Sequence, residues 1–303
     1  MKPNAVQILQ KNISLLTKNK IREYEYIPQH DKPLPSLAKL SEIVELLRAI
    51  VFPGYYGNVI VNSNTLEYHL GVNTEQLYGL LKEQIHNGLC FNATTDKQCS
   101  DAKLPAQEIT LTFIDAIPEL KRLVSTDVKA MFDGDPAARS YGEVIFCYPA
   151  IRAIFNYRIA HELLKLGIPV LPRIITELAH SETGIDIHPG AQIGEYFSID
   201  HGTGVVIGET TIIGNHVTLY QGVTLGAKRF TLDDHGNPIN VPRHPIIEDH
   251  VVIYANANIL GRITIGAGSV IGGNVWLTTS IPPNTRITQQ KAIEDSFIGG
   301  LGI

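Results

Sequence analysis

Isoleucine, leucine or valine returns at every sixth position through much of the C-terminal part of this 303-residue chain. Three runs share this spacing: Ile187, Ile193 and Ile199; Ile207, Ile213, Leu219 and Leu225; and Ile247, Ile253, Ile259, Ile265, Ile271 and Leu277. A six-residue period fits neither a helix of 3.6 residues per turn nor an ordinary hairpin sheet. It predicts a triangular solenoid of short strands, whose inward side chains stack as ladders about 4.8 Å apart.

The repeat is broken in two places. The first run is two residues out of phase with the second, and between Leu225 and Ile247 the repeat gives way to a polar stretch rich in Pro and Gly. We therefore expect the solenoid to occupy residues 181–282, with an excursion loop at 226–246 and a tail at 283–303. Loops that leave a rigid scaffold often carry function.

The part of the chain before residue 180 has a helical period instead. Ser36 is a suitable N-cap for a helix that ends before Pro53, and Asn87-Gly88 is a C-terminal signal for another. A third helix is expected between Pro149 and Gly167. The fold class predicted is α+β, with an N-terminal helical domain (1–180) followed by a parallel β-helix.

Composition narrows the class of protein further. A hydrophobic content of 44% and a charged content of 18% are those of a globular domain, and a net charge of -5 argues against binding to nucleic acid or anionic lipid. We expect neither a signal peptide nor a membrane span, which would need about 18 apolar residues. The three cysteines, Cys90, Cys99 and Cys147, lack metal-ligand spacing. Reduced thiols in a cytoplasmic protein are the expectation.

An acidic residue and a histidine interrupt the packing pattern in "IDHGTG". Because Ile199 points inward, Asp200 and His201 should project from the surface, as should Asp186 just before inward Ile187. A carboxylate beside an imidazole favours general-base catalysis near neutral pH. The spacing of Asp186 and His201 makes their contact plausible without showing it.

Several motifs together resemble one enzyme family. "GIDIHPGAQIG", "IDHGTGVVIGET", "QGVTLGA" and "RHP" follow in the order and approximate spacing of the serine acetyltransferases, over about residues 130–282. These are left-handed parallel β-helix enzymes that transfer an acetyl group from acetyl-CoA to the hydroxyl of L-serine, giving O-acetylserine and CoA in cysteine biosynthesis. The resemblance implies the same fold and reaction here, by direct transfer and with no metal.

The resemblance also assigns roles to residues. It implies that His201 is the catalytic base, with Asp186 as its dyad partner, and that Asp200 holds the amino group of serine. "GDPAA" resembles the family's "RDPA", which implies that Asp135 is a second serine-binding carboxylate.

The same comparison places Arg243 and His244 at the serine carboxylate and the reacting hydroxyl. The two predicted aspartates and this arginine suit an amino-acid zwitterion, which needs anions at one end and a cation at the other.

Contacts to CoA are less well defined by the sequence. Glycine-containing turns similar to those of the family suggest that CoA lies against five positions: Gly222, Gly226, Ala227, Gly261 and Gly266. The family's closing Gly-x-Pro-Ala segment is replaced here by "IPPNTRITQQKAIEDSF", so Arg286 and Lys291 are candidates for the CoA phosphates on charge alone.

The resemblance has consequences for assembly. Family members form trimers with active sites between subunits, and their helical domains pair trimers into hexamers, so a homotrimer or a dimer of trimers is expected. Family members often dock a C-terminal isoleucine into O-acetylserine sulfhydrylase, which makes Ile303 a candidate contact.

Three other functions remain open on sequence grounds. An acetyltransferase of the same fold could use a different hydroxyl acceptor, although a sugar offers no charges for the aspartates and arginine. A metal hydratase would need three histidines around zinc, and His244 and His250 could share one face. A non-catalytic binding protein could retain the scaffold, but it would not need Asp186, His201 and His244 together.

Overall fold

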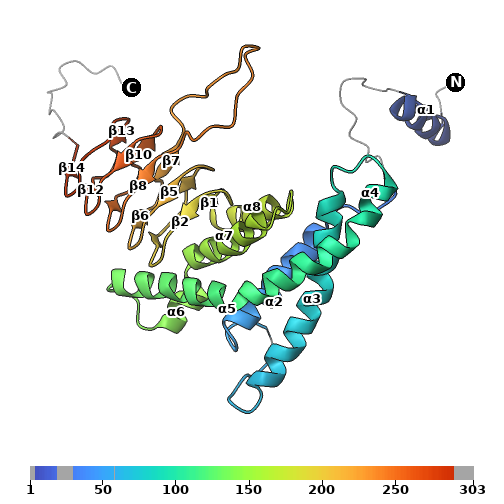
Figure 1. Cartoon of the computed structure of the whole chain (residues 1–303), viewed down its shortest axis with the longest axis horizontal. Helices are drawn as coiled ribbons and strands as arrows, with labels where there is room; N and C mark the ends of the chain where they lie inside the picture. The colour runs from blue at the N-terminus through green and yellow to red at the C-terminus, as the bar shows by residue number, and fades with distance from the viewer. Residues whose placement is uncertain (1–3, 19–29, 58, 290–303) are drawn as a thin grey trace.

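The computed structural model describes residues 4–18, 30–57 and 59–289. The helices precede the strands along the chain, as predicted (Figure 1). They are α1 (Ala5–Lys18), α2 (Leu37–Val51), α3 (Leu66–Cys90), α4 (Asp96–Asp101), α5 (Lys103–Gly134), α6 (Tyr141–Cys147), α7 (Pro149–Lys165) and α8 (Leu171–Thr183). Within the described ranges, no helix has the length and apolar character needed to cross a membrane.

Local signals account for most helix ends. The Ser36 side chain accepts a hydrogen bond from the backbone N–H of Lys39 and so caps α2, and Gly167 follows α7 with a positive φ of 78°. The predicted stop at Gly88 is wrong, because α3 continues to Cys90. A Cβ atom at Gly88 would lie 2.6 Å from Leu171 Cδ1, so this glycine permits close helix packing and does not end the helix.

The strands form a parallel solenoid of about five turns, matching a left-handed β-helix. They are β1 (Asp186–Ile187), β2 (Gln192–Ile193), β3 (Ser198–Asp200), β4 (Val206–Ile207), β5 (Ile212–Ile213), β6 (Thr218–Tyr220), β7 (Thr224–Gly226), β8 (Ile246–Ile247), β9 (Val252–Ile253), β10 (Asn258–Leu260), β11 (Thr264–Ile265), β12 (Val270–Ile271), β13 (Trp276–Leu277) and β14 (Arg286–Ile287). The predicted inward residues are buried, except that Leu277 is partly exposed.

Three sheets form the faces of the solenoid. Their strand orders are β1-β4-β7-β10-β13, β2-β5-β8-β11 and β3-β6-β9-β12-β14. Three edges of turns separate the faces. We call them the His201 edge (201–205, 221–223, 254–257 and 272–275), the His244 edge (188–191, 208–211, 227–245 and 261–263) and the His250 edge (194–197, 214–217, 248–251 and 266–269).

The breaks in the repeat are local. Asp186 pairs with Val206, 20 residues later, whereas Val206 pairs with Thr224, 18 residues later. The two additional residues lie on the His201 edge, where 201–205 replaces the three-residue turn of the next coil. The excursion loop, residues 227–245, projects from the His244 edge (Figure 1).

Two predicted boundaries need adjustment. Helix α8 extends to Thr183, beyond the predicted end of the helical domain at 180. Strand β14 pairs with β12, so the solenoid continues into the segment predicted as tail. The predicted contact residues Ile303 and Lys291 lie outside the described residues.

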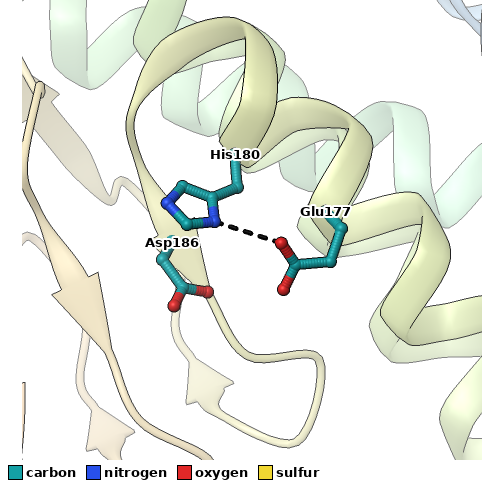
Figure 2. A group of neighbouring side chains, drawn as sticks. All are labelled: Glu177, His180 and Asp186. Carbon is teal, nitrogen blue, oxygen red and sulfur yellow. Dashed lines mark hydrogen bonds and ion pairs between the residues drawn. The ribbon is translucent and has the colours of Figure 1, made fainter.

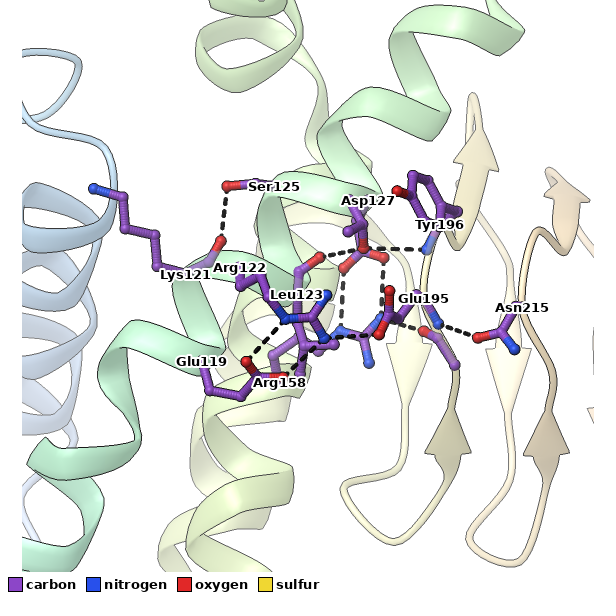
Figure 3. A network of polar contacts seen from close by, with 12 residues as sticks. Glu119, Lys121, Arg122, Leu123, Ser125, Asp127, Arg158, Glu195, Tyr196 and Asn215 are labelled. Carbon is purple, nitrogen blue, oxygen red and sulfur yellow. Dashed lines mark hydrogen bonds and ion pairs between the residues drawn. The ribbon is translucent and has the colours of Figure 1, made fainter.

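The first coil of the solenoid has no preceding coil, and helices α5 and α7 provide its hydrogen-bond partners (Figure 3). The Arg158 guanidinium donates to the carbonyls of Ile193 and Gly194, both at 2.6 Å, and the Phe197 N–H donates to Asp127 at 3.1 Å. Asp127 is fully buried and pairs with Arg158 at 3.0 Å. The helical part is thereby joined to the solenoid through satisfied backbone groups.

Candidate active site

His201 begins the longer turn, 201–205, of the first coil. Its backbone has a positive φ of 59°, and its side chain is 73% exposed. Gly202 follows with φ 88°, and a Cβ atom there would lie 2.5 Å from Ile185 Cδ1. The turn therefore packs inward through glycine and presents the imidazole outward, as predicted.

Two carboxylates lie beside His201 in a small pocket. Asp135 follows the end of α5 and Asp200 ends β3, and both line this pocket together with Tyr148 and Tyr220. Asp200 Oδ1 lies 3.8 Å from His201 Nε2. Helix α5 thus places a carboxylate from the helical part against the His201 edge, which brings together three of the predicted site residues.

Tyr148 holds the Asp135 carboxylate. Its hydroxyl donates to Asp135 Oδ2, while the backbone N–H of Ala137 donates to Oδ1 at 2.8 Å. These hydrogen bonds, with that from Tyr148 the larger influence, lower the pKa of Asp135. The same hydrogen bond raises the pKa of Tyr148 to about 12, so Asp135 is ionised and Tyr148 protonated near neutral pH.

A groove of about 400 Å³ runs from His201 along the solenoid. Tyr220 and Tyr254 stack along its wall, with ring centroids 4.8 Å apart, and Arg286 lies among its lining residues. Strands β3 and β14 stand at the two ends of their sheet, four strand spacings or about 19 Å apart. The groove therefore offers a long path from an imidazole to a cation.

Asp186 lies apart from His201 within the protomer. It pairs in register with Val206, and its carboxylate is 3.7 Å from Arg173 Nη1. Figure 2 shows Asp186 beside Glu177 and His180 of α8, with ligand atoms within 4.8 Å of one another. No contact within 4 Å joins Asp186 to His201, so the predicted dyad stays a prediction.

The Glu177, His180 and Asp186 group has donor atoms that suit a cation. However, Arg173 already forms ion pairs with both carboxylates. Its guanidinium supplies the positive charge that a metal ion would otherwise bring.

Arg243 and His244 lie on the His244 edge and are held by Thr210. The backbone N–H groups of both residues donate to Thr210 Oγ1, at 2.9 and 3.1 Å. Arg243 also donates to Glu209 at 2.7 Å, and this ion pair fixes the direction of the guanidinium.

The His244 imidazole is buried and neutral. Burial, with Arg243 as a further cause, lowers its pKa to about 4. The Thr210 N–H donates to His244 Nδ1 at 3.1 Å, so the ring proton belongs on Nε2. His244 can therefore donate a hydrogen bond but is a poor base.

The alternative of a zinc site would need His244 and His250 on one face, and the structure does not place them together. His250 lies on another edge, where its ring stacks on His216 with centroids 4.8 Å apart. The two rings therefore do not share a face of the solenoid.

The glycine-containing positions proposed for CoA are spread over all three edges. Gly222 lies on the His201 edge, Gly226, Ala227 and Gly261 adjoin the His244 edge, and Gly266 lies on the His250 edge. Packing explains two of the glycines, because a Cβ atom would lie 2.1 Å from Asn256 Oδ1 at Gly222 and 2.3 Å from Pro283 N at Gly266. The five positions do not form one surface within a protomer.

Four cations gather on the His244 edge. Lys228, Arg229, Arg243 and Arg262 line a pocket of about 410 Å³ between the excursion loop and the next coils. We call it the basic pocket. Its charge suits an anionic group such as a phosphate.

Comparison with known proteins identifies the fold and the family. The family model for bacterial transferase hexapeptide (six repeats) matches residues 244–279. The plasmid-encoded serine acetyltransferase of Synechococcus elongatus is 51% identical over 276 residues, which cover 89% of this chain and 86% of that protein. The chain belongs to the serine acetyltransferase family. It is therefore an acyltransferase.

Relatives and solved structures within the family agree. The serine acetyltransferase of Bacillus subtilis is 48% identical over 161 residues, covering 53% of this chain and 70% of that protein. Serine acetyltransferase 1 of Entamoeba histolytica, in complex with L-cysteine, superposes with a TM-score of 0.71 at 32% identity, covering 93% of this chain and 97% of that chain. The Neisseria gonorrhoeae family member in complex with serine gives a TM-score of 0.54 at 26% identity, covering 82% and 94%.

Several site residues escaped the sequence analysis. Tyr148 and Tyr220 line the carboxylate pocket, and Thr210 and Gly208 hold His244 and make space for it. A Cβ atom at Gly208 would lie 2.1 Å from His244 Cδ2. The six-residue register places 208–210 on the same edge as the excursion loop, and this register could have identified Gly208 and Thr210 as neighbours of His244.

Proposed function

We propose that this protein transfers the acetyl group of acetyl-CoA to the hydroxyl of L-serine. The observation that carries the proposal is the pocket that Asp135 and Asp200 both line, next to the exposed His201. Two carboxylates suit an ammonium group, and a base beside them suits a nearby hydroxyl. The family's structures in complex with serine and with cysteine support an amino acid as the ligand.

The acceptor's carboxylate needs a cation, and Arg243 is our candidate. It lies on the His244 edge, whereas His201, Asp135 and Asp200 meet at the His201 edge. We infer that the site is completed in a trimer, by the His201 edge of one subunit and the His244 edge of the next. This arrangement would also bring the neutral His244 near the reacting groups.

The proposed reaction is a direct transfer. His201 removes the proton from the serine hydroxyl as its oxygen attacks the thioester carbonyl. The C–S bond then breaks, the thiolate takes the proton from the imidazolium, and O-acetylserine and CoA leave. His244 Nε2–H is suited to donate a hydrogen bond to the negative charge that develops on oxygen.

The groove beside His201 is our candidate for the pantetheine arm of CoA. It begins at the base and ends near Arg286, about 19 Å away across the sheet, a span comparable with an extended pantetheine. The phosphates would then meet Arg286 or the basic pocket of the adjacent subunit. Comparing Arg286→Gln with Arg262→Gln would show which of these cations binds the CoA phosphates. The variant that lacks the phosphate-binding cation should have a raised KM for acetyl-CoA, and the other should not.

Cysteine biosynthesis in the cytoplasm is the corresponding cellular role that we propose. The predicted sulfhydrylase contact at Ile303 fits this role and lies outside the described residues. If deletion of Ile303 leaves the amount of O-acetylserine sulfhydrylase recovered in a pull-down unchanged, the predicted contact at Ile303 is overturned.

The first test measures thiol release from acetyl-CoA with L-serine, L-threonine, L-homoserine and a simple sugar as acceptors. We expect turnover with L-serine, a loss of roughly 10²–10⁴-fold in His201→Ala, and a raised KM for serine in Asp200→Ala. His216→Ala serves as the control, because this exposed histidine lies on the His250 edge. Turnover with another acceptor alone would favour the alternative acetyltransferase, and no turnover from a folded protein would favour the binding protein.

A further inference from the structure

The pocket beside His201 contains two carboxylates without a strong cationic partner. Among the residues that the structure describes, no lysine or arginine lies within 4 Å of the carboxylate of Asp135 or Asp200, and the His201 imidazole lies 3.8 Å from Asp200. A pair of this kind attracts a cationic ligand. The direction in which each carboxylate points then decides how well one ammonium group can reach both.

Tyr148 occupies the position that fixes the direction of Asp135. It is the N-cap residue of α7, directly before Pro149, so its backbone is held at the start of a long buried helix. Its N–H donates to the Val144 carbonyl, and its side chain reaches the pocket. Because this backbone is fixed and the side chain has few torsions, the Tyr148 phenol is a rigid hydrogen-bond donor.

The two oxygens of Asp135 are held differently. Oδ1 accepts from the Ala137 N–H within the turn that follows α5, and this local bond alone would leave Oδ2 free to rotate toward solvent. Oδ2 accepts from Tyr148, which comes from a different helix. An ionised carboxylate oxygen still has acceptor capacity for an ammonium N–H after accepting one hydrogen bond.

We propose that Tyr148 is a positioning residue for amino-acid binding, whose hydroxyl holds the Asp135 carboxylate toward Asp200 so that both carboxylates bind the ammonium group of the acceptor. The inference rests on the proposed function and adds a specific residue to it. Because Tyr148 acts through Asp135, its contribution belongs to binding of the acceptor and not to the proton transfer at His201.

The test is the variant Tyr148→Phe, which removes only the hydroxyl. A hydrogen bond to an ionised carboxylate is stronger than one between neutral groups, so we expect KM for L-serine to rise by about tenfold. We expect kcat within about twofold of the parent and an unchanged KM for acetyl-CoA. Tyr56→Phe is the matched control, because the Tyr56 hydroxyl donates to the Ile145 carbonyl in the same region of the fold and contacts no carboxylate of the pocket.

A second comparison separates positioning from a general structural effect. In an Asp135→Ala background, Tyr148→Phe should change serine kinetics no further, whereas a structural role would add its effect to that of Asp135→Ala. If Tyr148→Phe behaves like Tyr56→Phe in an enzyme that acetylates L-serine, the inference is overturned and the proposed function stands. A parent protein that does not acetylate L-serine overturns both.

Discussion

His244 shows how burial, with a cation beside it, determines the chemistry available to a residue. The ring is enclosed by its own turn and by Gly208, and Thr210 occupies its Nδ1 nitrogen. With a pKa of about 4, the ring remains neutral at physiological pH. The base in the proposed reaction is therefore the exposed His201, and His244 is confined to hydrogen-bond donation.

This pKa has a consequence for stability. In the unfolded chain a histidine has a pKa of about 6.5, so the unfolded state takes up a proton at a higher pH than the folded His244 does. We expect stability to fall as the pH drops from about 6.5 toward 4, by at most about 3 kcal/mol from this residue. Urea unfolding of the parent and of His244→Gln at pH 7 and pH 5, at fixed protein concentration, measures the difference.

The control for this experiment is His235→Gln, in the exposed excursion loop. It should retain the pH dependence of the parent, including the parts due to His161 and His188, whose pKa values burial also lowers. An unchanged pH dependence in His244→Gln would contradict the assignment.

Gly208 makes the position of His244 possible. In Gly208→Ala the added Cβ atom would overlap the imidazole, so the ring must move. We expect a loss of activity similar to that of His244→Ala and destabilisation of about 1–3 kcal/mol. Gly79→Ala is the control, since a Cβ atom there meets nothing within 4 Å. Full activity of Gly208→Ala in thiol-release assays would show that the ring position is not required.

At the scale of elements, α5 and α7 supply the hydrogen-bond partners that a preceding coil would give to the first coil of the solenoid. The carbonyls of Ile193 and Gly194 and the N–H of Phe197 receive side-chain partners from the helices in place of strand partners. The buried Asp127 carboxylate compensates the charge of Arg158. These backbone groups at the end of the β-helix are therefore satisfied by the helices.

Removing one member of this buried pair should be costly. We expect Arg158→Met or Asp127→Leu alone to destabilise the protein by about 3–5 kcal/mol, because each leaves an unpaired buried charge. The double variant should lose much less than the sum of the two. Chemical denaturation of all four proteins gives this coupling energy, and additive losses would mean that the two residues act independently.

Sequence patterns predicted the ladder positions of the solenoid correctly, but not the end of α3 or the presence of β14. The ladder positions were correct because each inward residue of a solenoid meets the same environment in every coil. The end of α3 was missed because Gly88 serves a contact with Leu171, which is distant in sequence. Strand β14 was missed because its coil is shortened, with Val270 pairing with Arg286 after 16 residues.

For the whole molecule, the main result is the separation of the predicted site residues between two edges. Sequence motifs identified His201, Asp200 and Asp135, and the structure brings the two aspartates into one pocket with His201 beside Asp200. Arg243 and His244 lie on another edge, and a repeat in one sequence gives no distance between the edges of the solenoid. The same limit explains why Asp186 pairs with Arg173 here and the five CoA positions are dispersed.

The inferred trimer makes a sharp prediction for mixed assemblies. His201→Ala and His244→Ala subunits should each form inactive trimers. Co-expressed with different affinity tags, they should form mixed trimers with one intact site each, since one interface joins a normal His201 edge to a normal His244 edge. Activity in the doubly purified protein tests this arrangement. A fully inactive mixture would place both histidines of each site in the same subunit.

The two additional residues on the His201 edge separate catalysis from architecture in this fold. The coils that follow close their turns without them, and the core ladders on either side continue in step. Deleting Thr203 and Gly204 would convert the first coil to the ordinary length and withdraw the imidazole into a regular turn. Under the proposed function, the catalytic capacity of this scaffold would therefore depend on the length of a single turn.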